Sequence, residues 1–155
     1  MTEAASTTPA RTLALDLGMR RIGLAISDAL GMTAQGLETF QRTTLREDVA
    51  RLGHFIREYE VGAIVIGNPL HMSGRDSRQG GYVKDFAGRL AERTGLPVIL
   101  WDERLTTVQA TRVLRESGIS QKKRGQAVDR LSAVLILQSY LDSLPGAAEW
   151  PDASE

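Results

Sequence analysis

The sequence predicts an α/β fold with a mixed sheet, in which an antiparallel N-terminal hairpin is followed by parallel strands and flanked by helices. Three observations support this prediction. Residues 12–28 (TLALDLGMRRIGLAISD) have the alternating apolar pattern of a strand, a tight turn and a second strand. The continuous apolar run at 62–67 (GAIVIG) is typical of a parallel strand that is covered on both faces. Amphipathic helices are predicted between the later strands, at 44–59 and 82–94.

Local signals in the first half of the chain predict where these elements begin and end. A third strand is expected at 32–40. Thr44 and Glu47 have the spacing of a capping box, which predicts a helix start at Thr44. Gly95 follows the helix at 82–94, in the position where a left-handed glycine often ends a helix. The segment 70–81 (LHMSGRDSRQGG) is polar and rich in glycine, so a loop is predicted there.

The last third of the chain contains one more strand and two helices. A second parallel strand is expected at 98–101 (VILW), and a helix should run from the threonines after it to Glu116. The segment 121–125 (QKKRG) is predicted to be a basic loop. The final helix then follows with Asp129 in its first turn, and the apolar block at 131–137 predicts that this helix is buried or forms an interface.

Composition limits the class of protein. A chain of 155 residues is expected to form one domain, at 11–144, between a disordered lead at 1–10 and a flexible acidic tail at 145–155. There is no cysteine, so a metal would have to bind to oxygen or imidazole. Net charge is zero, but all 19 Lys and Arg lie between Arg11 and Arg130, against 15 acids outside the two ends, which leaves +4. This charge is compatible with nucleic-acid binding. No signal peptide or membrane span is visible, so a cytoplasmic protein is expected.

Three groups of acidic residues are candidates for chemistry. Asp16 lies in an otherwise apolar strand, where a carboxylate is costly to bury without a partner. It either accepts hydrogen bonds from amides of the Gly18 turn or binds a metal ion. Asp102 and Glu103 end a later strand, and only one of them can face a given site because successive side chains alternate. Asp129 either stabilises a helix N-terminus or belongs to the same group of acids.

Together these motifs resemble the YqgF (RuvX) family of the ribonuclease H-like superfamily. The matching segments are DLGMRRIGLAISD, IVIGNPLHMSG, WDERLTT and QAVDRLSAVLILQSYL, in this order between about residues 12 and 141. The resemblance implies a ribonuclease H-like fold and a nuclease that processes the 5′ end of pre-16S rRNA, with a Holliday junction resolvase as the alternative. It also implies that Asp16, Glu103 and Asp129 are the catalytic acids and metal ligands. Related junction resolvases have an acid on the strand that corresponds to GAIVIG, where this chain has only Asn68. The choice between Glu103 and Asp102 as the second ligand therefore stays open.

The chemistry of these residues agrees with that function. Carboxylates that lie close together repel unless cations separate them, and oxygen ligands select Mg²⁺ or Mn²⁺. Two such ions can activate a water molecule and stabilise the leaving oxygen when a phosphodiester bond is hydrolysed. Arg104 either holds a phosphate or neutralises its acidic neighbours, and QKKRG either binds substrate or is simply solvated. Candidate nucleic-acid contacts are Arg20, Arg21, Asn68, Arg75, Arg78, Arg104, Lys122, Lys123 and Arg124.

Three classes of function are compatible with these features. The first is a metal-dependent nuclease that acts on RNA or branched DNA. The second is a phosphotransferase of the sugar-kinase and actin-like ATPase type, which shares the D-x-G pattern but needs a second large domain for which 155 residues leave no room. The third is a non-catalytic nucleic-acid adaptor, against which the presence of all three acids argues. No membrane partner is expected, and the oligomeric state stays open, with a homodimer as one option.

Overall fold

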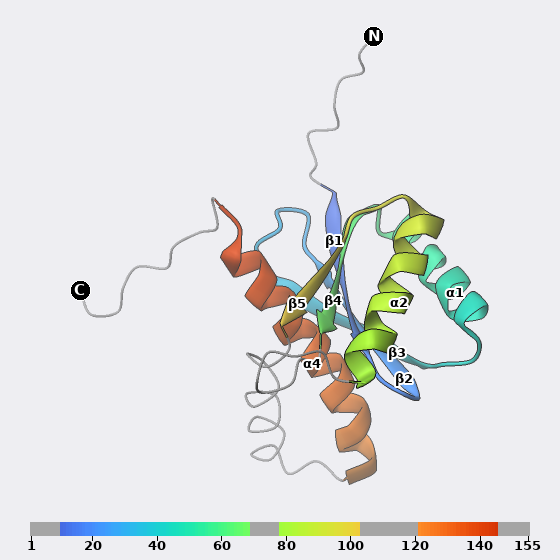
Figure 1. Cartoon of the computed structure of the whole chain (residues 1–155). Helices are drawn as coiled ribbons and strands as arrows, with labels where there is room; N and C mark the ends of the chain where they lie inside the picture. The colour runs from blue at the N-terminus through green and yellow to red at the C-terminus, as the bar shows by residue number, and fades with distance from the viewer. Residues whose placement is uncertain (1–9, 69–77, 103–120, 146–155) are drawn as a thin grey trace.

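The computed structural model describes residues 10–68, 78–102 and 121–145, with side chains from residue 82 in the second segment and from residue 131 in the third. Five strands form one sheet in the order β3-β2-β1-β4-β5 (Figure 1). The pairs β1–β2 and β2–β3 are antiparallel, and the pairs β1–β4 and β4–β5 are parallel, which confirms the predicted mixed sheet. The strands are β1 (Arg11–Leu17), β2 (Arg21–Ser27), β3 (Ala34–Gln41), β4 (Val61–Asn68) and β5 (Val98–Asp102).

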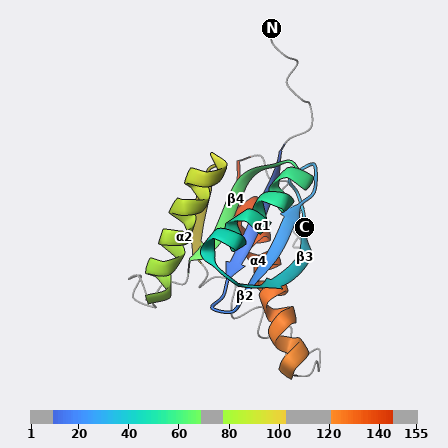
Figure 2. The same ribbon diagram turned by 90° about the vertical axis from the view of Figure 1, so that its right-hand side faces the viewer.

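Helices cover both faces of this sheet. Helices α1 (Leu45–Glu58) and α2 (Arg78–Thr94) lie on one face, and α4 (Gln121–Ser143) crosses the other (Figures 1 and 2). The strand that contains GAIVIG lies between β1 and β5 and contacts α1 and α2 on one face and α4 on the other, so its two apolar faces are both covered, as predicted. Within the described segments, none of the helices combines the length and the apolar character that crossing a membrane requires.

Side-chain alternation divides the core into two layers. The layer under α1 and α2 is the larger one and is built from the odd positions of β1 and the even positions of β2 and β4, among them Leu13, Leu15, Leu24, Ile64 and Ile66. The layer under α4 is made from small strand residues and from apolar residues of the helix: Ala14, Ala25, Val65, Ala133, Ile136 and Leu137. Because α4 packs on alanines, its axis can come close to β1 and β2. Position in a strand therefore tells which helix layer a side chain faces.

The predicted helix ends at Thr44 and Gly95 are confirmed. The Thr44 hydroxyl accepts a hydrogen bond from the backbone N–H of Glu47 at 3.1 Å, as in a capping box. Gly95 has φ of +72°, and its N–H donates to the carbonyl of Ala91 at 2.8 Å. Residues with a Cβ are strained at this φ, which explains the glycine.

The loop predicted at 70–81 is wrong in part, the loop predicted at 121–125 is wrong throughout, and one strand is shifted. α2 begins at Arg78, so 78–81 are helical despite two glycines. α4 begins at Gln121, so the QKKRG segment is helical and Asp129 lies eight residues after the helix start, not in the first turn. Gln, Lys, Arg and Ala are good helix formers, and one glycine among them costs only about 1 kcal/mol. The third strand runs from Ala34 to Gln41, two residues later at its start than expected.

The turn between β2 and β3 is organised by Asp28. Its carboxylate accepts the N–H of Met32 at 2.8 Å and of Thr33 at 3.2 Å. These two backbone hydrogen bonds, chiefly the one from Met32, hold the pKa of the Asp28 carboxyl below its ordinary value. A carboxyl whose pKa is lower in the folded than in the unfolded protein stabilises the fold above its unfolded pKa, and the contribution is lost as pH falls through the lowered folded value.

We therefore expect Asp28 to titrate with a midpoint below the ordinary pKa of an aspartate side chain. An NMR pH titration that follows the Asp28 carboxyl carbon measures this directly, and the Met32 and Thr33 amide protons should shift with the same midpoint. In Asp28→Asn these amide shifts should vanish. A midpoint at or above the ordinary value would mean that the two amides do not bind the carboxylate in solution.

Candidate active site at the carboxyl edge of the sheet

Asp16 is the candidate residue that the structure describes most fully. It is the sixth of the seven residues of β1 and is partly buried. Because β4 and β5 run parallel to β1, their carboxyl ends meet at the same edge, where Asn68 and Asp102 are the last residues of their strands. Ligand sites of open α/β sheets collect at this edge. Figure 1 shows the first turns of α4 (orange) extending beyond the same edge of the sheet.

On the α4 face, Asp16 lies in a row of residues that runs across all five strands. Asp16 is paired with Gly23 of β2, and Gly23 in turn with Thr39 of β3. On the other side, the β1–β4 ladder ends at Leu15 and Ile66, so Gly67 is the next neighbour of Asp16, and Gly67 is paired with Trp101. Glycine therefore occupies the positions beside Asp16 on both neighbouring strands. The Thr39 hydroxyl is buried and has no hydrogen-bond partner among the described residues.

Asn68 and Asp102 are on the opposite face of the sheet from Asp16. They are paired with each other across β4 and β5, and Asn68 shares its face with Ile64 and Ile66 of the α1/α2 layer. Asn68 is only 8 % exposed, and its Oδ1 has no hydrogen-bond partner within the described part of the chain. Asp16 and the Asn68–Asp102 pair therefore lie at one edge but on opposite faces of the sheet.

Helix α4 carries the third predicted acid, Asp129. Ser132 and Ala133, which follow it by three and four residues, are both buried. Residues at these spacings share one face of a helix, so Asp129 occupies a position on the stripe of α4 that packs on the sheet. Two further contacts fix the register of this helix: Trp101 Nε1 donates to Ser139 Oγ at 3.1 Å, and Gln138 Oε1 accepts the N–H of Ala34 at 3.0 Å.

The turn after Asp16 is held by backbone contacts. The N–H of Gly18 donates to the carbonyl of Arg21 at 2.9 Å, so this amide is used inside the turn. A Cβ at Gly18 would lie 2.8 Å from that carbonyl oxygen, which no side chain tolerates without a backbone shift. Arg20 is exposed in the same turn, close along the chain to Asp16, while Arg21 is partly buried at the start of β2.

Sequence reasoning missed Arg42, whose side chain binds the backbone of this turn. Its Nη1 donates to the carbonyl of Gly18 at 3.0 Å, and its Nε pairs with the buried carboxylate of Asp48 at 3.2 Å. The guanidinium also lies over the ring of Tyr82, 4.7 Å from its centroid. Arg42 thus joins the turn after Asp16 to α1 and α2. A signal was present, since Asp48 is a charged residue in the apolar stripe of α1 that contains Leu45 and Leu52.

Several predicted residues lie outside the described part of the structure. Arg75 falls in the segment 69–77, and Glu103 and Arg104 fall in 103–120, as does the helix expected up to Glu116. Arg78, Lys122, Lys123 and Arg124 are in the described helices, but their side chains are not described. Among the described side chains there is no group of three potential metal ligands, because two of the three predicted acids, Glu103 and Asp129, are not in that set.

Comparison with known proteins gives a consistent result. The family model described as "RuvX: Holliday junction resolvase" matches residues 10–143. A protein of Koribacter versatilis is 57 % identical over 132 residues, which cover 85 % of this chain and 86 % of that protein. Proteins of Thermoanaerobacter pseudethanolicus and Geobacillus kaustophilus are 51 % and 49 % identical, each over 86 % of this chain and over 96 % and 98 % of their own lengths. All three carry the name "Putative pre-16S rRNA nuclease".

Two solved structures with a similar fold are junction resolvases. The chain is similar to T. thermophilus RuvC in complex with a Holliday junction substrate, with a TM-score of 0.54 at 16 % identity over 87 % of this chain and 95 % of that one. It is also similar to the Fowlpox virus resolvase bound to junction DNA, with a TM-score of 0.53 at 12 % identity over 86 % and 97 % of the two chains. At these identities the likeness concerns the fold, which is the ribonuclease H-like fold expected from the sequence.

Proposed function

This chain belongs to the RuvX family, and on that basis we propose that it is a metal-dependent nuclease that hydrolyses phosphodiester bonds in RNA, with the 5′ region of pre-16S rRNA as its substrate. The observation that carries the proposal is the similarity to relatives named "Putative pre-16S rRNA nuclease", which are 49–57 % identical over most of the chain. Asp16 supports it because this carboxylate lies at the carboxyl edge of the sheet between two glycines. A ribosomal RNA substrate would place the protein in the cytoplasm.

RNA is favoured over junction DNA by the degree of similarity. Relatives that are 49–57 % identical carry the RNA-processing name. The junction-binding resolvases share only 12–16 % of their residues with this chain, so they support the fold alone. A resolvase-type DNA endonuclease is therefore the second candidate, and a non-catalytic adaptor the third.

The proposed ligands of Mg²⁺ or Mn²⁺ are Asp16, Glu103 and Asp129. The proposed donor set fits such a hard cation, since all three ligands would offer carboxylate oxygens, and Asp16 lies at the carboxyl edge of the sheet. Because side chains alternate along β5, Asp102 is on the α1/α2 face, away from Asp16. This position favours Glu103 as the second carboxylate. Asp129 is on the stripe of α4 that faces the sheet, and thus on the same side as Asp16. A two-metal site would supply an activated water and stabilise the leaving oxygen.

Substrate contacts are proposed around this edge. Arg20 is exposed in the turn after Asp16, which suits a contact to a phosphate near the cleaved bond. Lys122, Lys123 and Arg124 are in the first turns of α4, about two turns before Asp129, and we propose that they bind phosphates of the substrate near the metal site. Further proposed contacts are Arg21, Asn68, Arg75, Arg78 and Arg104.

The proposed function is tested by offering the purified protein three labelled substrates. These are precursor 16S rRNA, an unstructured single-stranded RNA and a four-way DNA junction, each with Mg²⁺, with Mn²⁺ or with EDTA. We expect cleavage of the precursor RNA that requires a divalent ion and exceeds cleavage of the junction. Preferred cleavage of the junction would favour the resolvase alternative, and binding of RNA without cleavage under any of these conditions would favour the adaptor.

A further inference from the structure

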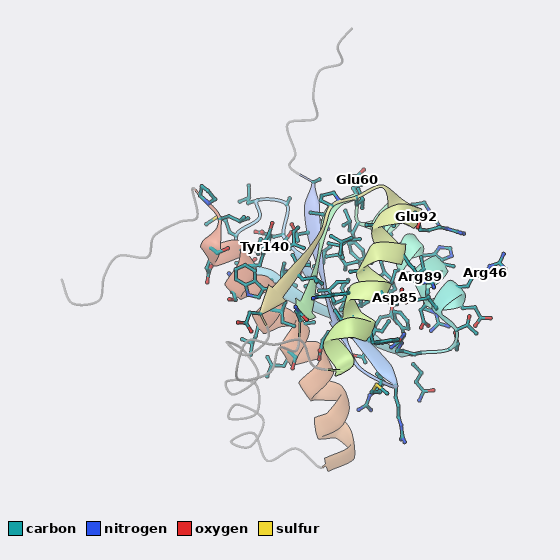
Figure 3. The ribbon with its side chains drawn as sticks, in the orientation of Figure 1. Arg46, Glu60, Asp85, Arg89, Glu92 and Tyr140 are labelled. Carbon is teal, nitrogen blue, oxygen red and sulfur yellow. The ribbon has the colours of Figure 1, made fainter. Side chains whose placement is uncertain are left out.

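A groove of about 780 Å³ lies between the two helices on the face of the sheet opposite α4. The N-terminal half of α1 contributes Leu45, Arg46 and Val49 to it, and the C-terminal half of α2 contributes Arg89, Glu92 and Arg93. Figure 3 shows Arg46, Arg89 and Glu92 on α1 and α2, on the far side of the molecule from Tyr140 of α4.

The groove has an apolar floor and a basic rim. Val49 is buried and Leu45 is partly buried against the core, whereas the three arginines are exposed. Glu92 is the one acid among the described lining residues of the groove. A second acid, Asp85, pairs with Arg89 at 3.3 Å. This pair is about 60 % exposed on both sides, so it is weak and Arg89 can exchange it for another anion.

The donors of the groove suit phosphate oxygens. Guanidinium groups bind phosphate in a bidentate manner. Leu45 and Arg46 are the first two residues of α1, and the N–H groups of such residues have no acceptor within their own helix. None of the described residues that line the groove is aromatic, so they offer no ring on which a base could stack. The groove is therefore suited to a nucleic-acid backbone of any sequence.

Continuity with the proposed active site favours RNA as the occupant. β3 runs antiparallel to β2, which runs antiparallel to β1, so β3 ends at the edge where Asp16 lies. α1 starts four residues after β3, and Arg42, between them, contacts the turn that follows Asp16. A strand of RNA bound at this edge can therefore pass to the other face beside the start of α1. An acidic peptide has no comparable path leading to the groove.

We propose that the α1–α2 groove binds the backbone of a single-stranded segment of the RNA substrate, outside the cleavage site. This inference rests on the proposed function and adds to it a second region of substrate contact. It predicts that long RNA gains affinity from the groove, whereas an RNA too short to leave the active site does not.

The test compares two double variants that remove the same charge. Arg46→Gln/Arg93→Gln alters the groove, and Arg57→Gln/Lys84→Gln alters exposed cations elsewhere on the same two helices. Binding of a labelled 30-nucleotide RNA is followed by fluorescence anisotropy in EDTA at several salt concentrations. Loss of two phosphate contacts should lower the slope of log affinity against log salt by about 1.4 and weaken binding at 0.1 M salt by about 25-fold. The control variant should match the parent.

The outcomes separate this proposal from the proposed nuclease function. Cleavage of a six-nucleotide RNA with Mg²⁺ should be the same in the groove variant and the parent, while KM for the long RNA rises. Equal affinity and equal salt slope in the two double variants would overturn the groove proposal even if the parent cleaves RNA. A parent that binds RNA through the groove but never cleaves it would overturn the nuclease function alone. A poly-glutamate peptide that binds the parent more tightly than RNA, and not the groove variant, would assign the groove to an acidic protein and overturn RNA as its occupant.

Discussion

Asp16→Asn is expected to reduce cleavage at least about a thousandfold, equivalent to about 4 kcal/mol, while the protein keeps its fold. The substitution retains the size of the side chain but removes a charged oxygen from the proposed metal site. Because the three proposed carboxylates would repel one another when no cation is bound, the metal-free variant should melt at the same temperature as the parent or at a higher one. Single-turnover cleavage of precursor RNA and a thermal melt in EDTA measure the two effects.

Asp28→Asn is the matched control for this substitution. Asp28 follows β2, which is antiparallel to β1, so it lies at the opposite edge of the sheet from Asp16. The same change of carboxylate to amide should leave cleavage near the parental rate. Full activity of Asp16→Asn, or an equal loss in both variants, would remove Asp16 from the mechanism.

Asp48→Ala is expected to destabilise the protein by about 3–5 kcal/mol, because it leaves a buried arginine without its counter-ion. Asp48 is 1 % exposed and Arg42 is 9 % exposed, and their side chains meet at 3.2 Å. The same carboxylate accepts the N–H of Thr43 at 3.0 Å, so the variant also leaves this donor without its partner. The shift of the urea midpoint, at constant slope, gives the free energy of unfolding that is lost.

Two further variants test whether the loss of stability comes from the burial of the ion pair or from the loss of any ion pair. Asp85→Ala breaks a pair with Arg89 of nearly the same length, 3.3 Å, but on the exposed surface, and should cost less than about 1 kcal/mol. Arg42→Met/Asp48→Leu replaces both buried charges with apolar groups and should recover a large part of the loss. If Asp48→Ala were as mild as Asp85→Ala, the buried pair would not hold α1 to the turn after Asp16.

Local sequence signals predicted much of this fold. The apolar run GAIVIG predicts an internal parallel strand, because only such a strand hides apolar residues on both faces, and β4 has that position. Thr44 and Gly95 were predicted from chemistry that operates within a few residues, and both helix ends have the expected hydrogen bonds. The errors arose where helix formation depends on the whole helix. The glycines near the start of α2 and the cations at the start of α4 were given more weight than helix propensity and tertiary packing allow.

The candidate site was less accessible to sequence reasoning than the fold. A carboxylate in an apolar strand singled out Asp16, but the glycines on both sides of it belong to other strands, and only the register of the sheet brings them together. The apolar stripe of α1 indicates that Asp48 is buried, but nothing local indicates that Arg42 is its partner or that Arg42 reaches Gly18. Alternation along β5 could be predicted, whereas the face on which Asp102 lies follows from its pairing with Asn68.

The position of the second carboxylate decides whether the catalytic centre lies on the α4 face of the sheet. The decisive comparison is the single-turnover cleavage rate of precursor RNA by Glu103→Gln and by Asp102→Asn, measured beside Asp16→Asn. A centre on the α4 face requires Glu103→Gln to lose as much activity as Asp16→Asn, and Asp102→Asn to stay within about fivefold of the parent, about 1 kcal/mol. Loss of cleavage in Asp102→Asn with activity retained in Glu103→Gln would contradict it and move the chemistry to the α1/α2 face.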